Sequence, residues 1–93
     1  MQVRRHLYYC GQVQGVGFRY RAHRLAGACG VAGFVRNLAD GRVELVVEGE
    51  DPAVEEYLAA VREKMRAYVA EVVERDEPPT GEFSTFEVAY DWG

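Results

Sequence analysis

The chain has 93 residues and a formal net charge of −4 at pH 7, with 48% hydrophobic and 28% charged residues. This length allows a single domain, which we expect residues 1–93 to form, and the composition is too apolar for a disordered chain. No apolar run approaches the roughly 20 residues that span a bilayer, and the N-terminus has no signal-peptide core, so we expect a cytoplasmic protein without membrane contact.

The first half of the chain predicts a strand, a glycine-rich connection, a helix and a hairpin. Residues 4–10 have the composition and alternation of a strand. From Phe18 the apolar residues recur at helical spacing, and Gly30 stands where a glycine ends a helix. Residues 31–36 and 42–48 then predict two strands joined by an Asp-Gly hairpin turn.

The second half predicts a helix followed by two strands. Asp51 is expected to cap the helix, and Pro52 suits its first position. The apolar stripe of this helix consists of Val54, Leu58, Val61 and Met65. Residues 68–74 and 83–90 close the chain as strands, and the register of the first of these strands is left open.

The resulting order of elements is β-α-β-β-α-β with one further strand. Because each helix has a single apolar stripe, both helices should cover the same face of the sheet. The sequence therefore predicts an α+β fold of the ferredoxin-like split βαβ type, with an antiparallel sheet of four to five strands and two helices packed on one face. In this arrangement the first and third strands are central neighbours.

The segment most suggestive of chemistry joins the first strand to the first helix and reads Gly-Gln-Val-Gln-Gly-Val-Gly-Phe-Arg over residues 11–19. Gly15 and Gly17 allow the main chain to curl so that amide N–H groups converge at the positive end of the helix, which suits a phosphate-like anion. The Arg19 guanidinium can bind two oxygens of one phosphate. Residues 1–46 carry a net charge of +5, which agrees with an anion site in this half. A tight turn followed by a surface arginine is the alternative.

Asn37 ends the second predicted strand, just before the hairpin. An asparagine in this position is commonly part of a turn. The end of this strand and the loop after the first strand should both open toward the first helix, however, so Asn37 is also a candidate for holding a water beside a bound phosphate. Its amide both donates and accepts hydrogen bonds, which suits positioning rather than proton removal.

Together these two segments resemble the acylphosphatase family. Residues 11–19 match the family's GxVQGVGFR string, and residues 33–44 match its second string, with Phe34 where tryptophan is common. The Gly-Pro turn usual after the second helix is absent, but the order of elements agrees over nearly the whole chain. The resemblance implies hydrolysis of acyl phosphates to a carboxylate and inorganic phosphate, without a metal or another cofactor.

The resemblance also implies roles for individual residues. The family's phosphate-binding arginine corresponds to Arg19, and its water-positioning asparagine corresponds to Asn37. Its cradle of backbone amides corresponds to Gln14, Gly15, Val16, Gly17, Phe18 and Arg19. The implied partner is a small-molecule acyl phosphate, and because nothing in the sequence demands an oligomer we expect a monomer.

Other candidate residues have simpler interpretations. His23 follows Arg19 on the same side of the helix, but a solvated helix histidine is the simpler expectation, and His6 is expected to be an exposed strand residue. Three tyrosines near the glycine-rich loop either line an apolar wall for the acyl group or only pack: Tyr8, Tyr9 and Tyr20.

The two cysteines, Cys10 and Cys29, are too few for a disulfide scaffold and lack zinc-ligand spacing. We expect them to be small buried side chains, and a disulfide between them stays open.

Three other functions fit parts of the pattern. A regulatory anion-binding module would use the same loop without turnover, but it has no need of Asn37. RNA-recognition motifs share the predicted topology, but they display aromatic residues on the central strands, whereas residues 42–48 read Arg-Val-Glu-Leu-Val-Val-Glu, so we expect no nucleic-acid partner. A copper chaperone would need a Cys-x-x-Cys loop, which is absent.

Overall fold

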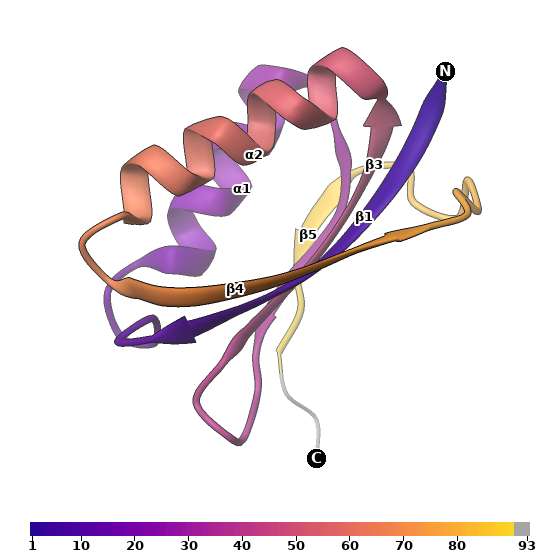
Figure 1. Cartoon of the computed structure of the whole chain (residues 1–93). Helices are drawn as coiled ribbons and strands as arrows, with labels where there is room; N and C mark the ends of the chain where they lie inside the picture. The colour runs from indigo at the N-terminus through magenta and orange to yellow at the C-terminus, as the bar shows by residue number, and fades with distance from the viewer. Residues whose placement is uncertain (91–93) are drawn as a thin grey trace.

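Five strands form one layer of the structure, and two helices pack together on one face of that sheet (Figure 1). The computed structural model describes residues 1–90. In chain order the elements are β1 (Gln2–Gly11), α1 (Phe18–Cys29), β2 (Ala32–Asn37), β3 (Val43–Glu50), α2 (Asp51–Met65), β4 (Val69–Glu77) and β5 (Phe86–Val88). The predicted ferredoxin-like α+β fold is confirmed. Neither helix in the described residues is long and apolar enough to cross a membrane.

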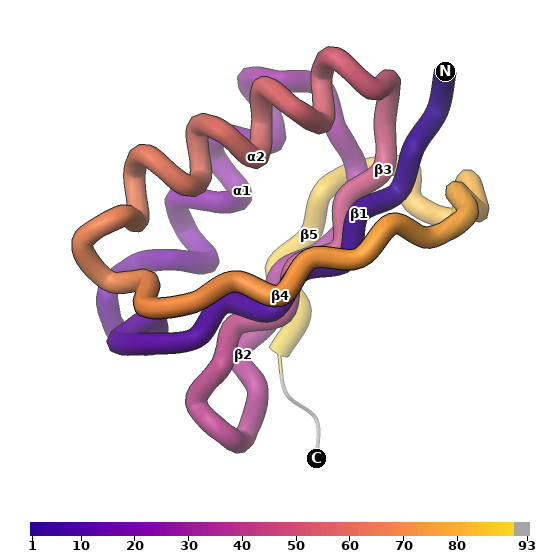
Figure 2. Tube along the Cα trace, viewed as in Figure 1, coloured from indigo at the N-terminus to yellow at the C-terminus, as the bar shows by residue number. Residues whose placement is uncertain are grey.

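The pairing of β1, β3 and β2 determines where the functional segments lie. The strand order is β4-β1-β3-β2-β5, so β1 and β3 are the predicted central neighbours. Because β3 runs antiparallel to both β1 and β2, these two strands run in the same direction, and their C-terminal ends lie at the same end of the sheet. Val43 of β3 is paired with Tyr9 of β1 on one side and with Asn37 of β2 on the other. Figure 2 shows the connection after β1 and the turn after β2 at the same end of the molecule.

The last strand departs from the predicted antiparallel sheet. β5 pairs parallel with β2, so the sheet is mixed. β5 also covers only three residues instead of 83–90. The reason is the route of residues 78–85. β4 ends beside the start of β1, and this connection follows that end of the sheet, so β5 begins beside the start of β2 and runs in the same direction.

Two further differences from the predicted elements concern β4 and the start of α2. β4 covers Val69–Glu77 rather than 68–74, and it pairs antiparallel with β1 with one irregularity near the end of β1, which resolves its register. Glu50 rather than Asp51 is the N-cap of α2, and it caps through backbone geometry without a side-chain hydrogen bond. Pro52 lies in the first turn as predicted.

The helices bury the apolar stripes that the sequence predicts. The buried residues of these stripes are Phe18, Ala22, Ala26, Val54, Leu58, Val61 and Met65. Tyr57 of α2 was not predicted to belong to the core, but it is fully buried. Its hydroxyl donates to the carbonyl oxygen of Ala22 at 2.9 Å, so this hydrogen bond joins α2 to α1. The position of α1, which carries Arg19, is therefore fixed by both packing and a polar contact.

The face of the sheet away from the helices carries buried ion pairs. The side chain of Glu48 on β3 is only 6% exposed. It accepts a hydrogen bond from Arg4 Nη1 at 2.9 Å. It also accepts hydrogen bonds from the backbone N–H groups of Thr80 at 3.0 Å and Gly81 at 2.9 Å. A single carboxylate thus holds the connection between β4 and β5 against the sheet.

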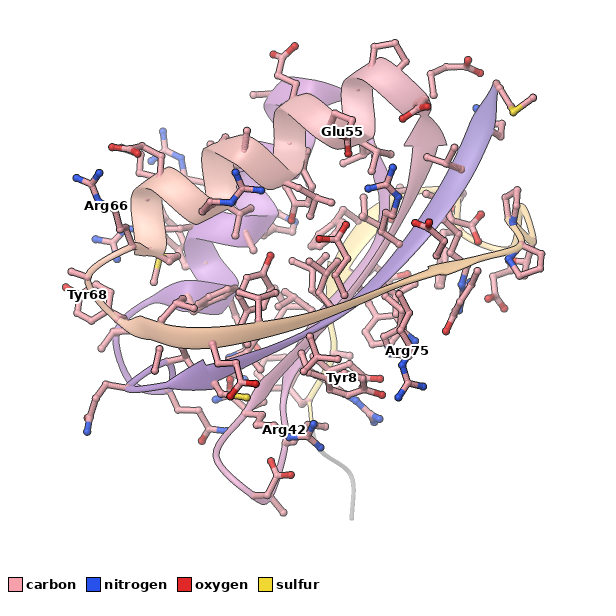
Figure 3. The ribbon with its side chains drawn as sticks, in the orientation of Figure 1. Tyr8, Arg42, Glu55, Arg66, Tyr68 and Arg75 are labelled. Atoms are coloured by element: carbon pink, nitrogen blue, oxygen red, sulfur yellow. The ribbon has the colours of Figure 1, made fainter. Side chains whose placement is uncertain are left out.

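His6 lies on the same face, and the prediction of an exposed residue was wrong. Its side chain is 17% exposed, with Nδ1 2.8 Å from Glu77 and Nε2 2.7 Å from Glu44. These carboxylates belong to β4 and β3, the two strands that flank β1, so sheet formation itself encloses the imidazole. The labelled Tyr8 and Arg42 mark this face in Figure 3, and the Arg42 guanidinium lies 4.6 Å from the centre of the Tyr8 ring.

Glu48 is expected to make the stability of the fold depend on pH. Burial alone would raise the pKa of this carboxyl group, but hydrogen bonds from Thr80 and Arg4 outweigh burial and lower the pKa from 4.5 to about 2. A lowered pKa stabilises the folded state only while the carboxylate is ionised, so this contribution is present above pH 4.5 and is lost as the pH falls toward 2.

We therefore expect acidification over this range to lower the free energy of unfolding of the wild type by roughly 2–3 kcal/mol more than that of Glu48→Gln. Urea unfolding of both proteins at a series of pH values measures this difference. The same pH dependence in both proteins would contradict the role given to Glu48.

Candidate active site

The connection between β1 and α1, residues 12–17, passes twice through left-handed backbone at glycine. Gly15 has φ 77° and Gly17 has φ 80°, which L side chains rarely adopt. The carbonyl oxygen of Gly17 accepts the backbone N–H of Arg21 at 3.0 Å. The carbonyl oxygen of Val16 accepts a hydrogen bond from Arg21 Nη1 at 2.8 Å. Two carbonyl groups of the loop are therefore bound by α1, which fixes the curl of the chain.

The backbone N–H groups of residues 14–19 are the unpaired donors of this loop. Within residues 1–90 none of them donates to a protein acceptor. Those of Phe18 and Arg19 lie in the first turn of α1, where a helix supplies no partner for its own amides. The helix dipole adds partial positive charge at the same place. This arrangement of free donors at a helix N-terminus is suited to an oxyanion.

A pocket of about 270 Å³ lies against these donors. It is lined by Val13, Gly15, Gly17, Phe18, Arg19, Tyr20, Asn37, Val88 and Tyr90. The structure thus brings together Arg19 and Asn37, the two residues for which the sequence predicts roles in a reaction. Of the predicted cradle, Gln14 and Val16 do not line the pocket. The Gln14 side chain is bonded elsewhere, and Val16 packs against the core.

Asn37 reaches the pocket because of strand pairing. It is the last residue of β2 and lies level with Tyr9, two strands away across Val43. Adjacent strands are about 4.7–4.9 Å apart, so the end of β1 is roughly 10 Å away. The glycine-rich loop that follows β1 spans this gap toward α1. The sequence-based expectation that the ends of β1 and β2 open toward the first helix agrees with this placement.

Gln14 ties the loop to the hairpin that carries Asn37. Its Nε2 donates to the carbonyl oxygen of Leu38 at 2.8 Å and to that of Arg42 at 3.0 Å. These two residues stand on opposite sides of the β2–β3 turn, and the Leu38 backbone N–H in turn donates to the carbonyl oxygen of Arg42 at 2.8 Å. The glycine-rich loop and the end of β2 are therefore linked by hydrogen bonds as well as by the sheet.

Val88 and Tyr90 also line the pocket, although the sequence does not predict a role for them. β5 pairs with β2 through Val35 and Val88, so the chain that follows β5 passes the end of β2 where Asn37 lies. The Arg19 guanidinium carbon is 5.3 Å from the centre of the Tyr90 ring, within cation–π range. No local pattern identifies these residues, because their place depends on the parallel pairing of β5.

Several other candidates lie away from this pocket. His23 does not line it, and Tyr9 is buried in the core, while Tyr8 packs on the opposite face of the sheet. Of the three candidate tyrosines only Tyr20 lines the pocket. Asp40 accepts the backbone N–H of Arg42 at 3.0 Å, as expected of a turn residue.

Neither cysteine lines the pocket. Cys10 and Cys29 are free thiols that are partly rather than fully buried, so the disulfide left open by the sequence is not formed. Among residues 1–90, no group of three or more His, Cys, Asp or Glu side chains is arranged to hold a metal ion.

The structure is a ferredoxin-like α+β fold in which free amides of a glycine-rich loop face a pocket. Comparison with known proteins agrees with this fold. The acylphosphatase family model matches residues 5–88. The acylphosphatase of Synechococcus sp. (strain JA-2-3B'a(2-13)) is 48% identical over 88 residues, which is 94% of this chain and 93% of that protein.

Solved structures give the same result. The crystal structure of acylphosphatase from Bacillus subtilis matches with a TM-score of 0.85 and 29% identity, over 97% of this chain and 100% of that one. An acylphosphatase from Coxiella burnetii matches with a TM-score of 0.83 and 30% identity, over 95% and 93% of the two chains. The chain belongs to the acylphosphatase family, whose members are hydrolases that act on acid anhydrides.

The Gln14 link yields a stability prediction with an internal control. Gln14→Ala removes two hydrogen bonds on a part of the surface that is exposed, so we expect the free energy of unfolding to fall by about 1 kcal/mol. Gln12 is exposed in the same loop and its side chain makes no hydrogen bond within residues 1–90, so Gln12→Ala should stay within about 0.5 kcal/mol of the wild type. Urea unfolding measures both, and equal stability of the two variants would show that the link contributes nothing.

Proposed function

We propose that this protein hydrolyses acyl phosphates in the pocket between the glycine-rich loop and the end of β2. The observation that carries the proposal is the meeting of three groups in one pocket. These are the unpaired amides of Gly15, Gly17, Phe18 and Arg19, the guanidinium of Arg19 and the carboxamide of Asn37. Family membership supplies the substrate class, and the local geometry supplies a task for each group.

The loop and Arg19 are proposed to bind the phosphoryl group. The backbone amides are fixed donors, because the curl of the loop is set by Gly15, Gly17 and the bonds from Arg21. Donors that are already oriented stabilise developing charge without reorganisation. The planar fork of Arg19 can bind two phosphoryl oxygens at once, which a single ammonium group cannot do. The Tyr90 ring beside it restricts the orientation of this side chain.

Asn37 is proposed to place the attacking water. The water oxygen forms a new bond to phosphorus while the bond from phosphorus to the acyl oxygen breaks, and the electron pair of that bond leaves with the carboxylate. A carboxylate is a good leaving group, so positioning and charge stabilisation are the main demands on the protein. Since an amide is not a base at neutral pH, the water proton passes to a phosphoryl oxygen. The products are a carboxylate and inorganic phosphate.

The same proposal includes the organisation of the protein. All the named groups come from one chain, which supports a monomer with residues 1–93 acting as one domain. Two free thiols, Cys10 and Cys29, are in keeping with a reducing compartment and support a cytoplasmic location.

A regulatory module that binds anions without turnover is the rival function. Release of phosphate from benzoyl phosphate by the purified protein, with a chelator present, separates the two.

Replacement of Arg19 should impair both binding and rate. Its guanidinium contacts the anion in the ground state and in the transition state alike. We expect Arg19→Ala to lower kcat/KM for benzoyl phosphate by about 10²-fold or more, with a higher KM and a lower kcat. Arg75 lies on the outer face of the sheet (Figure 3), so Arg75→Ala is a control that removes one guanidinium far from the pocket. Equal activity of the two variants would refute the role of Arg19.

Replacement of Asn37 should mainly lower the rate. We expect Asn37→Ala to reduce kcat by roughly 10²-fold with little change in KM, because the amide holds the water and not the phosphoryl group. Steady-state kinetics with benzoyl phosphate measure this, and circular dichroism verifies the fold. Turnover close to that of the wild type would mean that the assignment of Asn37 is wrong.

A further inference from the structure

The basic side chains fall into two groups according to whether carboxylates neutralise them. Within residues 1–90, five of the eleven Lys and Arg side chains lie within 4.0 Å of a carboxylate: Arg4, Arg5, Arg36, Arg42 and Arg66. The other six have no such partner there: Arg19, Arg21, Arg24, Arg62, Lys64 and Arg75. In a chain with net charge −4, side chains left without a carboxylate partner are the places where an external anion meets least competition.

Three of these six cations line one hollow next to the active-site pocket. The hollow, which we call the basic groove, has a volume of about 480 Å³ and lies where α1 meets the C-terminal end of α2. Its lining residues are Tyr20, Arg21, Arg24, Leu25, Ala28 and Lys64. None of them is acidic. Tyr20 also lines the active-site pocket, so its side chain stands between the two hollows.

Groove residues make direct contacts with Tyr20 and with the glycine-rich loop. Arg24 Nη1 donates to the Tyr20 hydroxyl at 3.3 Å, and its guanidinium carbon lies 5.8 Å from the centre of the Tyr20 ring. Arg21 binds the loop carbonyl oxygen of Val16. The hollow that contains Arg19 and the one that contains Arg24 and Lys64 therefore share Tyr20 as a common wall.

We propose that the basic groove is a second anion subsite, which binds a negatively charged group on the acyl part of the substrate. The preferred substrates are then acyl phosphates of dicarboxylic acids or of other acids with a distal anionic group. This inference rests on the proposed function, because it assumes that the phosphoryl group occupies the pocket beside Arg19. The acyl chain then extends past Tyr20 and places its distal carboxylate near Arg24 and Lys64.

Such a contact changes binding more than chemistry. The distal carboxylate is remote from phosphorus, so the groove holds it equally in the ground state and in the transition state. An anionic acyl group should therefore lower KM and leave kcat nearly unchanged. The groove is open to solvent, so the advantage should be moderate and should weaken at high salt.

The test compares matched pairs of substrates. Succinyl, glutaryl and adipoyl phosphates are each paired with the neutral alkanoyl phosphate of the same chain length, and kcat/KM is measured for every substrate. The ratio of anionic to neutral substrate cancels the general attraction of the protein for the phosphoryl group. The double variant Arg24→Gln/Lys64→Gln removes two of the three groove charges and keeps Arg21, which binds the loop, as well as Arg19 and Asn37. The double variant Arg62→Gln/Arg75→Gln removes the same charge from side chains that line neither the groove nor the pocket.

We expect the wild type to favour the anionic member of at least one pair by about 3- to 10-fold through KM, at low ionic strength. The groove variant should lose this preference and keep its activity on neutral substrates, and the control variant should retain the preference. A ratio near one at every chain length, or the same loss in both variants, would overturn the subsite and leave the proposed function intact. Failure to hydrolyse any of these substrates would overturn the proposed function and the subsite with it.

Discussion

The antiparallel pairing of β3 with both β1 and β2 is the constraint on which the site depends. Although α1 separates β1 from β2 in the sequence, this pairing places the C-terminal ends of both strands at the same end of the sheet. Tyr9 and Asn37 lie there on either side of Val43. The glycine-rich loop begins at the end of one strand and Asn37 ends the other. A register shift of one residue would turn the Asn37 side chain to the other face of the sheet, away from α1. The register of the sheet therefore determines the position of Asn37 relative to the glycine-rich loop.

Within this frame the loop obtains its donors from backbone geometry. Left-handed glycines turn two carbonyl groups toward Arg21, and the first turn of α1 has no internal partners for its amides. The unpaired donors are thus a consequence of how the strand joins the helix. Gln14 adds two hydrogen bonds that join the loop to the hairpin. Donors that are preorganised in this way are suited to stabilising charge on a phosphoryl group without reorganisation of the loop.

The parts of the site that could be predicted are those with local signals. Gly15 and Gly17 mark a curled loop, Arg19 follows at the start of a helical pattern, and Asn37 precedes a hairpin turn. Tyr90 could not be predicted in the same way, because its place beside Arg19 follows from the parallel pairing of β5. The ion pairs of the outer face were missed for a related reason. His6, Glu44 and Glu48 alternate with apolar residues, which is also the pattern of an exposed strand face, and their partners are distant in the sequence.

The central claim is that the amides of residues 14–19 and the side chains of Arg19 and Asn37 surround one phosphoryl group. Titration of the ¹⁵N-labelled protein with inorganic phosphate, followed by NMR, tests it without reference to catalysis. The account predicts saturable shifts of the amide signals of residues 14–19 and of the Asn37 carboxamide, with one common dissociation constant, and their loss in Arg19→Ala. Saturable shifts confined to other residues, or shifts of the loop without any change at Asn37, would contradict it.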